Sequence, residues 1–263
     1  MKQKKNKDMA VKVSSRSISA TEALVVHLIC SLGLAVAFWV AHNVHSINLT
    51  THPSHTLRLI CVFECPIVIL LYSRYRKDHE RCSYLKAVGR GLLGLPAGAL
   101  LNALGAIALG APVGIQYLPK TINWSLVMSL FTVSALLYNV VLQSILDGIL
   151  PLSLSYNPVF YIICGYRALV VKNCACSFCF WFIMDGLAMH ICIAFDPVDY
   201  MICIPAHGVI IGAWIGAFPM PLDWERPWQE WPICVSYGAI AGYLVAMVAS
   251  FGLILVRQHV KGD

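Results

Sequence analysis

Two carboxylates beside a guanidinium are the residues of this chain best suited to chemistry, because Asp223 and Glu225 lie next to Arg226. Such a carboxylate pair can act as general acid and general base. The same two-residue spacing also suits a tight turn that is pinned by ion pairs. Phosphoryl transfer would also need an activated nucleophile, charge-neutralising cations and a polar domain to hold them. The loops outside residues 134–195 are short, so we favour the structural interpretation and predict no catalytic residues.

Sequence motifs of the common enzyme classes are missing as well. The chain contains no P-loop, no Gly-x-Ser-x-Gly and no His-Glu-x-x-His. One cysteine cluster, Cys174-x-Cys176-x-x-Cys179, has His190 and Cys192 downstream. Zinc sites usually begin with Cys-x₂₋₄-Cys, so the one-residue spacing fits a metal poorly. We predict that the chain is not an enzyme and has neither a metal site nor a cofactor.

Glu64 is an ionisable residue inside an apolar run of about residues 57–72. A carboxyl at that depth in a membrane is costly, and its presence by default suggests a function. The simpler interpretation is a carboxyl that faces the helix bundle and is either protonated or paired with a base such as Arg58. We favour that interpretation.

The composition places the chain in a membrane. Of 263 residues, 59% are hydrophobic and 12% charged, and the mean hydropathy is +0.71. Soluble domains carry about twice that charged fraction. The net charge of +6 does not indicate nucleic-acid binding, because the basic residues cluster at loops. The eleven cysteines lie mostly in apolar runs and are predicted to be small buried hydrophobic residues.

Apolar runs predict an all-α polytopic transmembrane bundle of about six spans. The runs lie near residues 20–41, 57–72, 89–118, 125–146, 201–218 and 233–256. Residues 134–195 overlap the fourth run and are apolar without a clean period, so they are either an insertion or a gene-model artefact, and they contain one or two uncertain apolar segments. Residues 1–19 are predicted to be a disordered basic tail, residues 20–256 the transmembrane domain and residues 257–263 a second tail.

Glycine repeats every four residues predict helix faces shaped for close packing. One stripe comprises Gly94, Gly98, Gly110 and Gly114, a second Gly208, Gly212 and Gly216, and a third Gly238 and Gly242. Three stripes in so few spans suggest that at least one of them meets another protein.

The stretch 212–231 joins the last two predicted spans and is rich in tryptophan and proline. Proline cannot continue a helix, and tryptophan favours the level of the lipid headgroups. We therefore expect a stiff hairpin at the membrane surface that contacts a partner. The predicted contact residues are Trp214, Pro219, Pro221, Asp223, Trp224, Glu225, Arg226, Pro227, Trp228 and Trp231.

Within this stretch, FPMPLDWERPWQEWPI, with GAWIGA before it and YGAIAGY after it, resembles the C-terminal signature of the PIG-F family of glycosylphosphatidylinositol (GPI) biosynthesis proteins. The resemblance extends over GAPVGIQYLPKTINWSLVMSLFTV and DPVDYMICIPAHG. It implies a small polytopic protein of the endoplasmic reticulum. It also implies a non-catalytic subunit that stabilises the transferases PIG-O and PIG-G, which add ethanolamine phosphate to mannoses of the GPI precursor. The alternative is a membrane enzyme or carrier that acts on a phospholipid or isoprenoid.

Most of the 19 basic residues fall in the segments predicted to be cytosolic, so both termini are expected there and the hairpin in the lumen. The expected partners are then PIG-O-like and PIG-G-like transferases and membrane lipids. The sequon Asn48-Leu49-Thr50 would be a lumenal glycosylation acceptor.

Overall fold

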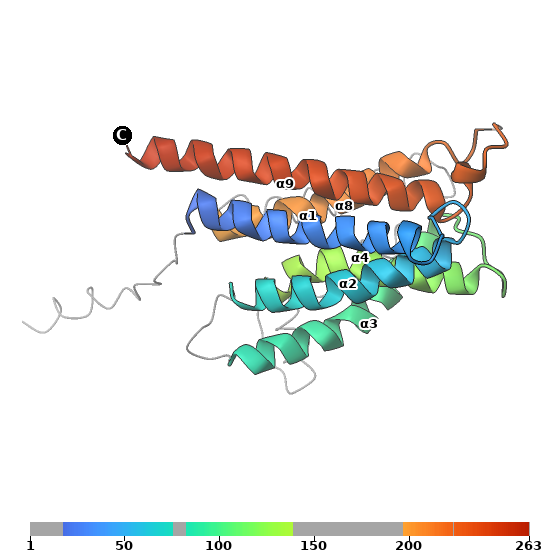
Figure 1. Cartoon of the computed structure of the whole chain (residues 1–263), viewed down its shortest axis with the longest axis horizontal. Coiled ribbons are helices and arrows are strands. Elements are labelled where there is room, and N and C mark those ends of the chain that lie inside the picture. The colour runs from blue at the N-terminus through green and yellow to red at the C-terminus, as the bar shows by residue number, and fades with distance from the viewer. Residues whose placement is uncertain (1–17, 76–82, 139–196, 223, 263) are drawn as a thin grey trace, which may run out of the picture.

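Six long helices make up the part of the chain described by the computed structural model, namely residues 18–75, 83–138, 197–222 and 224–262. Their bounds are α1 (Ala20–Asn43), α2 (Pro53–Ser73), α3 (Tyr84–Ala108), α4 (Leu118–Tyr138), α8 (Pro197–Ala217) and α9 (Ile233–Gly262) (Figure 1). Most of the segment 134–195, the cysteine cluster at 174–192 and most of the 1–19 tail lie outside the described residues. The predicted tail 257–263 continues α9 to Gly262.

Five of these helices, α1, α2, α3, α8 and α9, are long and apolar enough to cross a membrane. The predicted all-α, multi-pass membrane bundle is therefore confirmed. Local signals explain where the helices begin. Ser19 and Glu22 form a capping box at the start of α1, and Pro53 occupies the first turn of α2, where it leaves no internal hydrogen bond unmade.

The third predicted helix was expected to run to Leu118 and is shorter than that. α3 ends at Ala108, and Gly110 adopts a left-handed φ of 98°. The Gly110 N–H donates to the Ile107 carbonyl at 3.1 Å and the Ala111 N–H to the Ala106 carbonyl at 2.9 Å, which is the hydrogen-bond pattern of a Schellman cap. Gly110 and Gly114 therefore lie beyond the helix and do not extend its packing stripe. Gly94 and Gly98 are buried within α3.

The other two glycine stripes, of α8 and α9, pack directly against each other. A methyl group on Gly212 would overlap the Gly238 carbonyl and approach the Gly242 Cα to 2.8 Å, and one on Gly216 would reach the Cys234 carbonyl at 2.5 Å. Only glycine permits this backbone approach, so α8 and α9 form the most extensive helix pair among the described residues.

α4 lies against α2, α3 and α8 and contributes Phe131 to the buried core. The Phe131 and Tyr243 rings meet with centroids 4.4 Å apart, which connects α4 to α9. Ser129 Oγ donates to the Leu95 carbonyl of α3 at 2.8 Å. The side chains of α4 thus join the α2–α3 half of the bundle to the α8–α9 half.

Glu64 is fully buried where α2 crosses α1, and neither of its oxygens has a hydrogen-bond partner. Its Oε1 lies 2.8 Å from the position that a Cβ on Gly33 would occupy. The suggested partner Arg58 instead donates from Nε to Asn123 Oδ1 at 3.3 Å. Glu64 therefore faces the bundle as predicted, without a partner among the described residues.

The two ends of the bundle differ in character. Gln258 Nε2 donates to the Ile18 carbonyl at 3.2 Å, so the start of α1 and the last turns of α9 meet at one end, called here the terminal end. The opposite end, the hairpin end, carries the loops 44–52 and 109–117 and the hairpin 218–232 (Figure 1).

Candidate functional site

The hairpin is a series of tight turns closed around one buried amide. After α8, the Met220 N–H donates to the Ala217 carbonyl at 3.0 Å and the Leu222 N–H to the Pro219 carbonyl at 3.1 Å. A short 3₁₀ turn, Pro227–Gln229, follows, and the Ile233 N–H then donates to the Glu230 carbonyl at 2.7 Å. The closely spaced prolines prevent helix formation, and the turns replace it.

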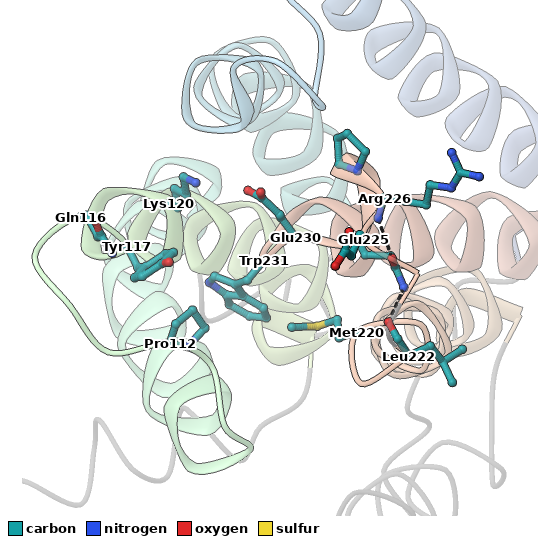
Figure 2. A pocket seen from close by; sticks show the side chains of 12 residues that line it. Pro112, Gln116, Tyr117, Lys120, Met220, Leu222, Glu225, Arg226, Glu230 and Trp231 are labelled. Atoms are coloured by element: carbon teal, nitrogen blue, oxygen red, sulfur yellow. Dashed lines mark hydrogen bonds between the residues drawn. The ribbon is translucent and has the colours of Figure 1, made fainter.

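Gln229 is the residue that holds these turns together. It is 8% exposed, and its Nε2 donates to the carbonyls of Pro219 at 2.7 Å and Leu222 at 2.9 Å. Its Oε1 accepts from the Arg226 N–H at 2.9 Å (Figure 2). One side chain therefore connects both arms of the hairpin and makes three hydrogen bonds inside a buried site. The sequence analysis did not select Gln229, because a lone glutamine carries no distinctive signal.

Trp231 attaches the hairpin to the bundle. Its indole Nε1 donates to Thr121 Oγ1 at 3.0 Å, and its ring lies 4.9 Å from that of Trp124, centroid to centroid. Trp231 and Trp124 are 8% and 7% exposed. Trp231 was predicted to contact a partner protein, whereas the structure places it against α4 of the same chain.

Two other tryptophans of the hairpin point outward. Trp224 is 56% exposed and Trp228 is 38% exposed, and their rings meet edge to face with centroids 6.2 Å apart. Trp214, in the last turn of α8, packs edge to face on the exposed Phe218 at 4.4 Å. The hairpin thus has an inner face, built by Gln229 and Trp231, and an outer face, formed by Trp224 and Trp228.

The charged residues of the hairpin do not gather into one cluster. Glu225 has a left-handed φ of 50°, which few non-glycine residues adopt, and it is exposed together with Arg226 and Pro227. Asp223 lies outside the described residues, so the predicted carboxylate pair is described at Glu225 only. Pro219 is half-buried and Pro221 is exposed at the tip.

A cavity of about 750 Å³ separates the hairpin from α4 and its preceding loop. The loop side contributes Pro112, Gln116, Tyr117 and Lys120 (Figure 2). The hairpin side contributes Met220, Leu222, Glu225, Arg226, Pro227, Gln229, Glu230 and Trp231. A second hollow of about 290 Å³ adjoins it and is lined by the segment Thr50–His55 and by Ile233.

Lys120 and Glu230 line both hollows and therefore stand at the boundary between them. Neither forms an ion pair with another residue in the described part of the chain. The Lys120 ammonium lies 5.6 Å from the centroid of the Tyr117 ring. The lining of the larger cavity thus carries two basic residues, Lys120 and Arg226, and two acidic residues, Glu225 and Glu230, beside Tyr117 and Trp231. Sequence reasoning had no means of bringing residues 112–120 against residues 220–231.

The predicted packing residues lie apart from this cavity, along the helices, except for Gly110 and Gly114 in the loop that leads to it. Asn48 is exposed at the hairpin end, where its Oδ1 accepts from Thr50 Oγ1 at 2.6 Å and from the Thr51 N–H at 2.8 Å. Among the described residues, no three His, Cys, Asp or Glu side chains come together in a way that could hold a metal ion.

Comparison with known proteins identifies relatives. Residues 31–251 match the model of the GPI biosynthesis protein family Pig-F. A mouse (Mus musculus) protein named "GPI ethanolamine phosphate transferase, stabilizing subunit" is 64% identical over 39 residues, which are 15% of this chain and 18% of that protein. The "Glycosylphosphatidylinositol anchor biosynthesis protein 11" of Yarrowia lipolytica is 50% identical over 62 residues, 24% of this chain and 27% of that protein.

A Schizosaccharomyces pombe protein named "PIGF/3-ketodihydrosphingosine reductase fusion protein" is 63% identical over 41 residues, 16% of this chain and 8% of that protein. Each of these alignments thus covers about a quarter or less of the relative's own length. No solved structure matches the chain.

Proposed function

Since the chain belongs to the GPI biosynthesis protein family Pig-F, we propose that it is a non-catalytic stabilising subunit of GPI ethanolamine phosphate transferases. The name of the mouse relative describes such a subunit, and this supports the proposal. The partners are PIG-O-like and PIG-G-like transferases. The protein resides in the membrane of the endoplasmic reticulum.

The outward tryptophan pair is the observation that carries this proposal. Trp224 and Trp228 expose large aromatic surfaces on a hairpin that Gln229 and Trp231 hold rigid. Tryptophan is enriched among the residues that dominate protein interfaces, since it buries a large area at a small cost in side-chain entropy. A preorganised loop also loses less conformational entropy when it binds. The outer face of the hairpin is therefore the docking contact for the transferase.

The arrangement of the cavity side chains supports a non-catalytic role. The lining of the larger cavity includes no serine, threonine, cysteine or histidine, and its groups with acid–base chemistry are Tyr117, Lys120, Glu225 and Glu230. No hydrogen bond or ion pair joins these four described side chains, so none of them is held as an activated pair of nucleophile and base. The amide of Gln229 already forms three hydrogen bonds with the hairpin backbone. In our proposal the partner transferase supplies the reacting groups.

The orientation in the membrane follows from the charges. Arg74, Lys86 and Arg257 lie at the terminal end, whereas Lys120 and Arg226 lie at the hairpin end. The basic segment 1–19 immediately precedes α1 in the sequence. Basic residues are more frequent on the cytosolic side of a membrane. Both termini are therefore cytosolic and the hairpin end faces the lumen.

Affinity purification of the tagged full-length chain from mild detergent tests this function. We expect a GPI ethanolamine phosphate transferase to be recovered with the wild-type chain. Trp228→Ala and Trp224→Ala should each lower its recovery about tenfold or more, the effect of removing an interface anchor. The matched control is Trp39→Ala, because Trp39 is 61% exposed on α1 and lies outside the hairpin.

The activity recovered should fall in proportion to the transferase recovered. Purification of the chain alone, with turnover on a phospholipid or isoprenoid, would instead establish the alternative of a membrane enzyme or carrier. If both tryptophan variants recover as much transferase as the wild-type chain, the hairpin is not the docking contact.

A further inference from the structure

We propose that the cavity between α4 and the hairpin binds an ethanolamine phosphate group, with Lys120 facing the phosphate and Glu230 the ammonium. The choice of ethanolamine over other ammonium groups rests on the proposed function, whereas the zwitterionic character of the ligand rests on the cavity alone. The source of the group is either a phospholipid of the surrounding membrane or a water-soluble phosphate ester, and the two are separated by experiment below.

The size and location of the cavity suit a lipid headgroup. Its volume of about 750 Å³ lies within the range of small-molecule sites, which is roughly 300–1,000 Å³. It lies at the hairpin end, where the spans finish, and its lining includes Tyr117 and Trp231. Tyrosine and tryptophan favour the headgroup level of a membrane. A phospholipid in the adjacent leaflet can therefore place its headgroup in the cavity while its acyl chains remain in the bilayer.

The cavity is lined by two basic and two acidic residues, and of these Lys120 and Glu230 also line the second hollow, so this pair is assigned to the two ends of a zwitterion. Lys120 is half-buried on the first turn of α4, and Glu230 precedes Trp231 on the opposite wall (Figure 2). The two residues line the boundary of both hollows, yet neither forms an ion pair with a described residue. A lysine ammonium binds phosphate as a point charge, and a carboxylate accepts hydrogen bonds from a primary ammonium. A ligand that carries both charges would satisfy both side chains at once.

The floor of the cavity is preformed. The hydrogen bond from Trp231 to Thr121 and the ring contact with Trp124 fix the indole in place, and Gln229 fixes the wall above it. Because the site needs little rearrangement, the protein loses little conformational entropy when the ligand binds.

The cavity and the docking contact use different faces of the hairpin. Trp224 and Trp228 do not line either hollow, whereas Trp231 lines the larger one. Binding of a transferase to these two side chains is therefore compatible with an occupied cavity. In this arrangement the subunit holds an ethanolamine phosphate headgroup beside its partner transferase. The bound molecule is either the donor or the product of the transfer that the partner catalyses.

Native mass spectrometry of the full-length chain in detergent tests the proposal. The chain is titrated with phosphatidylethanolamine, with phosphatidylcholine, which lacks ammonium N–H donors, and with phosphatidic acid, which lacks the ammonium. We expect phosphatidylethanolamine to bind at least about tenfold more tightly than either, the usual effect of one charge-assisted contact. Equal binding of the three lipids would overturn the proposal.

Two variants locate the site. Lys120→Gln and Glu230→Gln should each weaken the binding of phosphatidylethanolamine about tenfold, and Lys120→Arg should retain most of it. Apart from the contact of Lys120 with the Tyr117 ring, neither side chain forms a hydrogen bond or an ion pair with a described residue, so both variants should unfold at the wild-type temperature. Lys86→Gln, an exposed lysine on α3 at the terminal end, is the control and should bind normally. Unchanged binding by both cavity variants would place the lipid elsewhere and refute the assignment.

Two further measurements complete the test. One identifies the source of the ethanolamine phosphate group, and the other distinguishes failure of the ligand site from failure of the proposed function. Competition by O-phosphoethanolamine shows that the headgroup suffices, whereas its failure to compete shows that the ligand is a membrane lipid. The same preparations are scored for the transferase. If the transferase is recovered but the chain shows no preference for phosphatidylethanolamine, only the cavity assignment is refuted. If the chain prefers phosphatidylethanolamine but no transferase is recovered, the proposed function is refuted and the ligand site stands.

Discussion

The indole Nε1 of Trp231 donates to the hydroxyl of Thr121 across 3.0 Å and so joins the hairpin to α4. The two residues are 110 positions apart in the chain and are 8% and 4% exposed. This hydrogen bond and the adjoining contact of Trp231 with Trp124 close one side of the cavity. The stability of the hairpin and the shape of the cavity therefore depend on the same residue.

Replacement of Trp231 by phenylalanine should test that connection. Trp231→Phe keeps an aromatic ring but removes the N–H donor and part of the buried ring volume, so it should lower the free energy of unfolding by about 1–3 kcal/mol. Trp231→Ala leaves a cavity and should cost about 3–5 kcal/mol. Thermal unfolding in detergent measures both, with Trp39→Phe as the exposed control. Equal losses from the two Trp231 variants would show that the ring contributes little compared with the indole N–H, and an unchanged stability of Trp231→Phe would show that the hydrogen bond contributes little.

Gln229→Glu should weaken the hairpin although it preserves the shape of the side chain. The carboxylate would face the carbonyl oxygens of Pro219 and Leu222 without a hydrogen to donate. Such buried mismatches cost about 1–3 kcal/mol, and more for a charged group. Gln116→Glu, an exposed glutamine of the same cavity, should change stability by less than about 0.5 kcal/mol. Limited proteolysis at the hairpin, compared between these variants, would detect local opening; equal cleavage would count against Gln229.

Alanine at the glycines between α8 and α9 should separate these helices. A methyl group at Gly212 or Gly242 would overlap backbone atoms of the facing helix, and overpacking of this kind costs about 1–3 kcal/mol. Gly252→Ala, on the same α9 with nothing within 4 Å of its added methyl, should be harmless. Cysteine cross-linking between α8 and α9 reports the separation. Wild-type cross-linking in the Gly212 variant would refute the close contact.

Gly110 should be sensitive to substitution for a reason of backbone conformation. Gly110→Ala has space for its methyl group but must keep a φ of 98°, which should cost about 1–2 kcal/mol. Gly89→Ala, in the interior of α3 with the same free space, should instead stabilise the protein by about 0.5–1 kcal/mol. Chemical or thermal denaturation of the purified chain compares the two. Stabilisation by both would show that α3 continues past Ala108.

The proposed orientation predicts that Asn48 carries an N-linked glycan and that tags at both termini are digested by protease in intact microsomes. Asn48 is exposed at the hairpin end, on the side proposed to be lumenal. Thr50→Val should abolish the glycan, which an endoglycosidase-dependent mobility shift measures. Protection of either terminus from the protease would contradict the orientation, whatever the state of Asn48.

Much of the architecture could be read from the sequence. Apolar runs of spanning length predicted the helices, because a backbone in lipid must satisfy its own hydrogen bonds. The tryptophan- and proline-rich signature at 218–233 predicted a hairpin and the family, and the family match over residues 31–251 confirms the resemblance. Gly110 shows the limit of such patterns. Its four-residue spacing fits a packing stripe, but a glycine beyond the last turn also ends a helix, and periodicity alone does not choose between the two.

The tertiary structure decided what each tryptophan of the hairpin does. Trp228 and Trp231 are close neighbours of one residue type in one loop, yet one is exposed and the other is packed against α4. Which of them turns inward depends on Thr121 and Trp124, far away in the chain. The cavity between Lys120 and Glu230 arises in the same way from two loops that meet only when α4 packs against α8. Local sequence governs hydropathy, caps and turns, whereas a site built from distant segments exists only once the helices have packed.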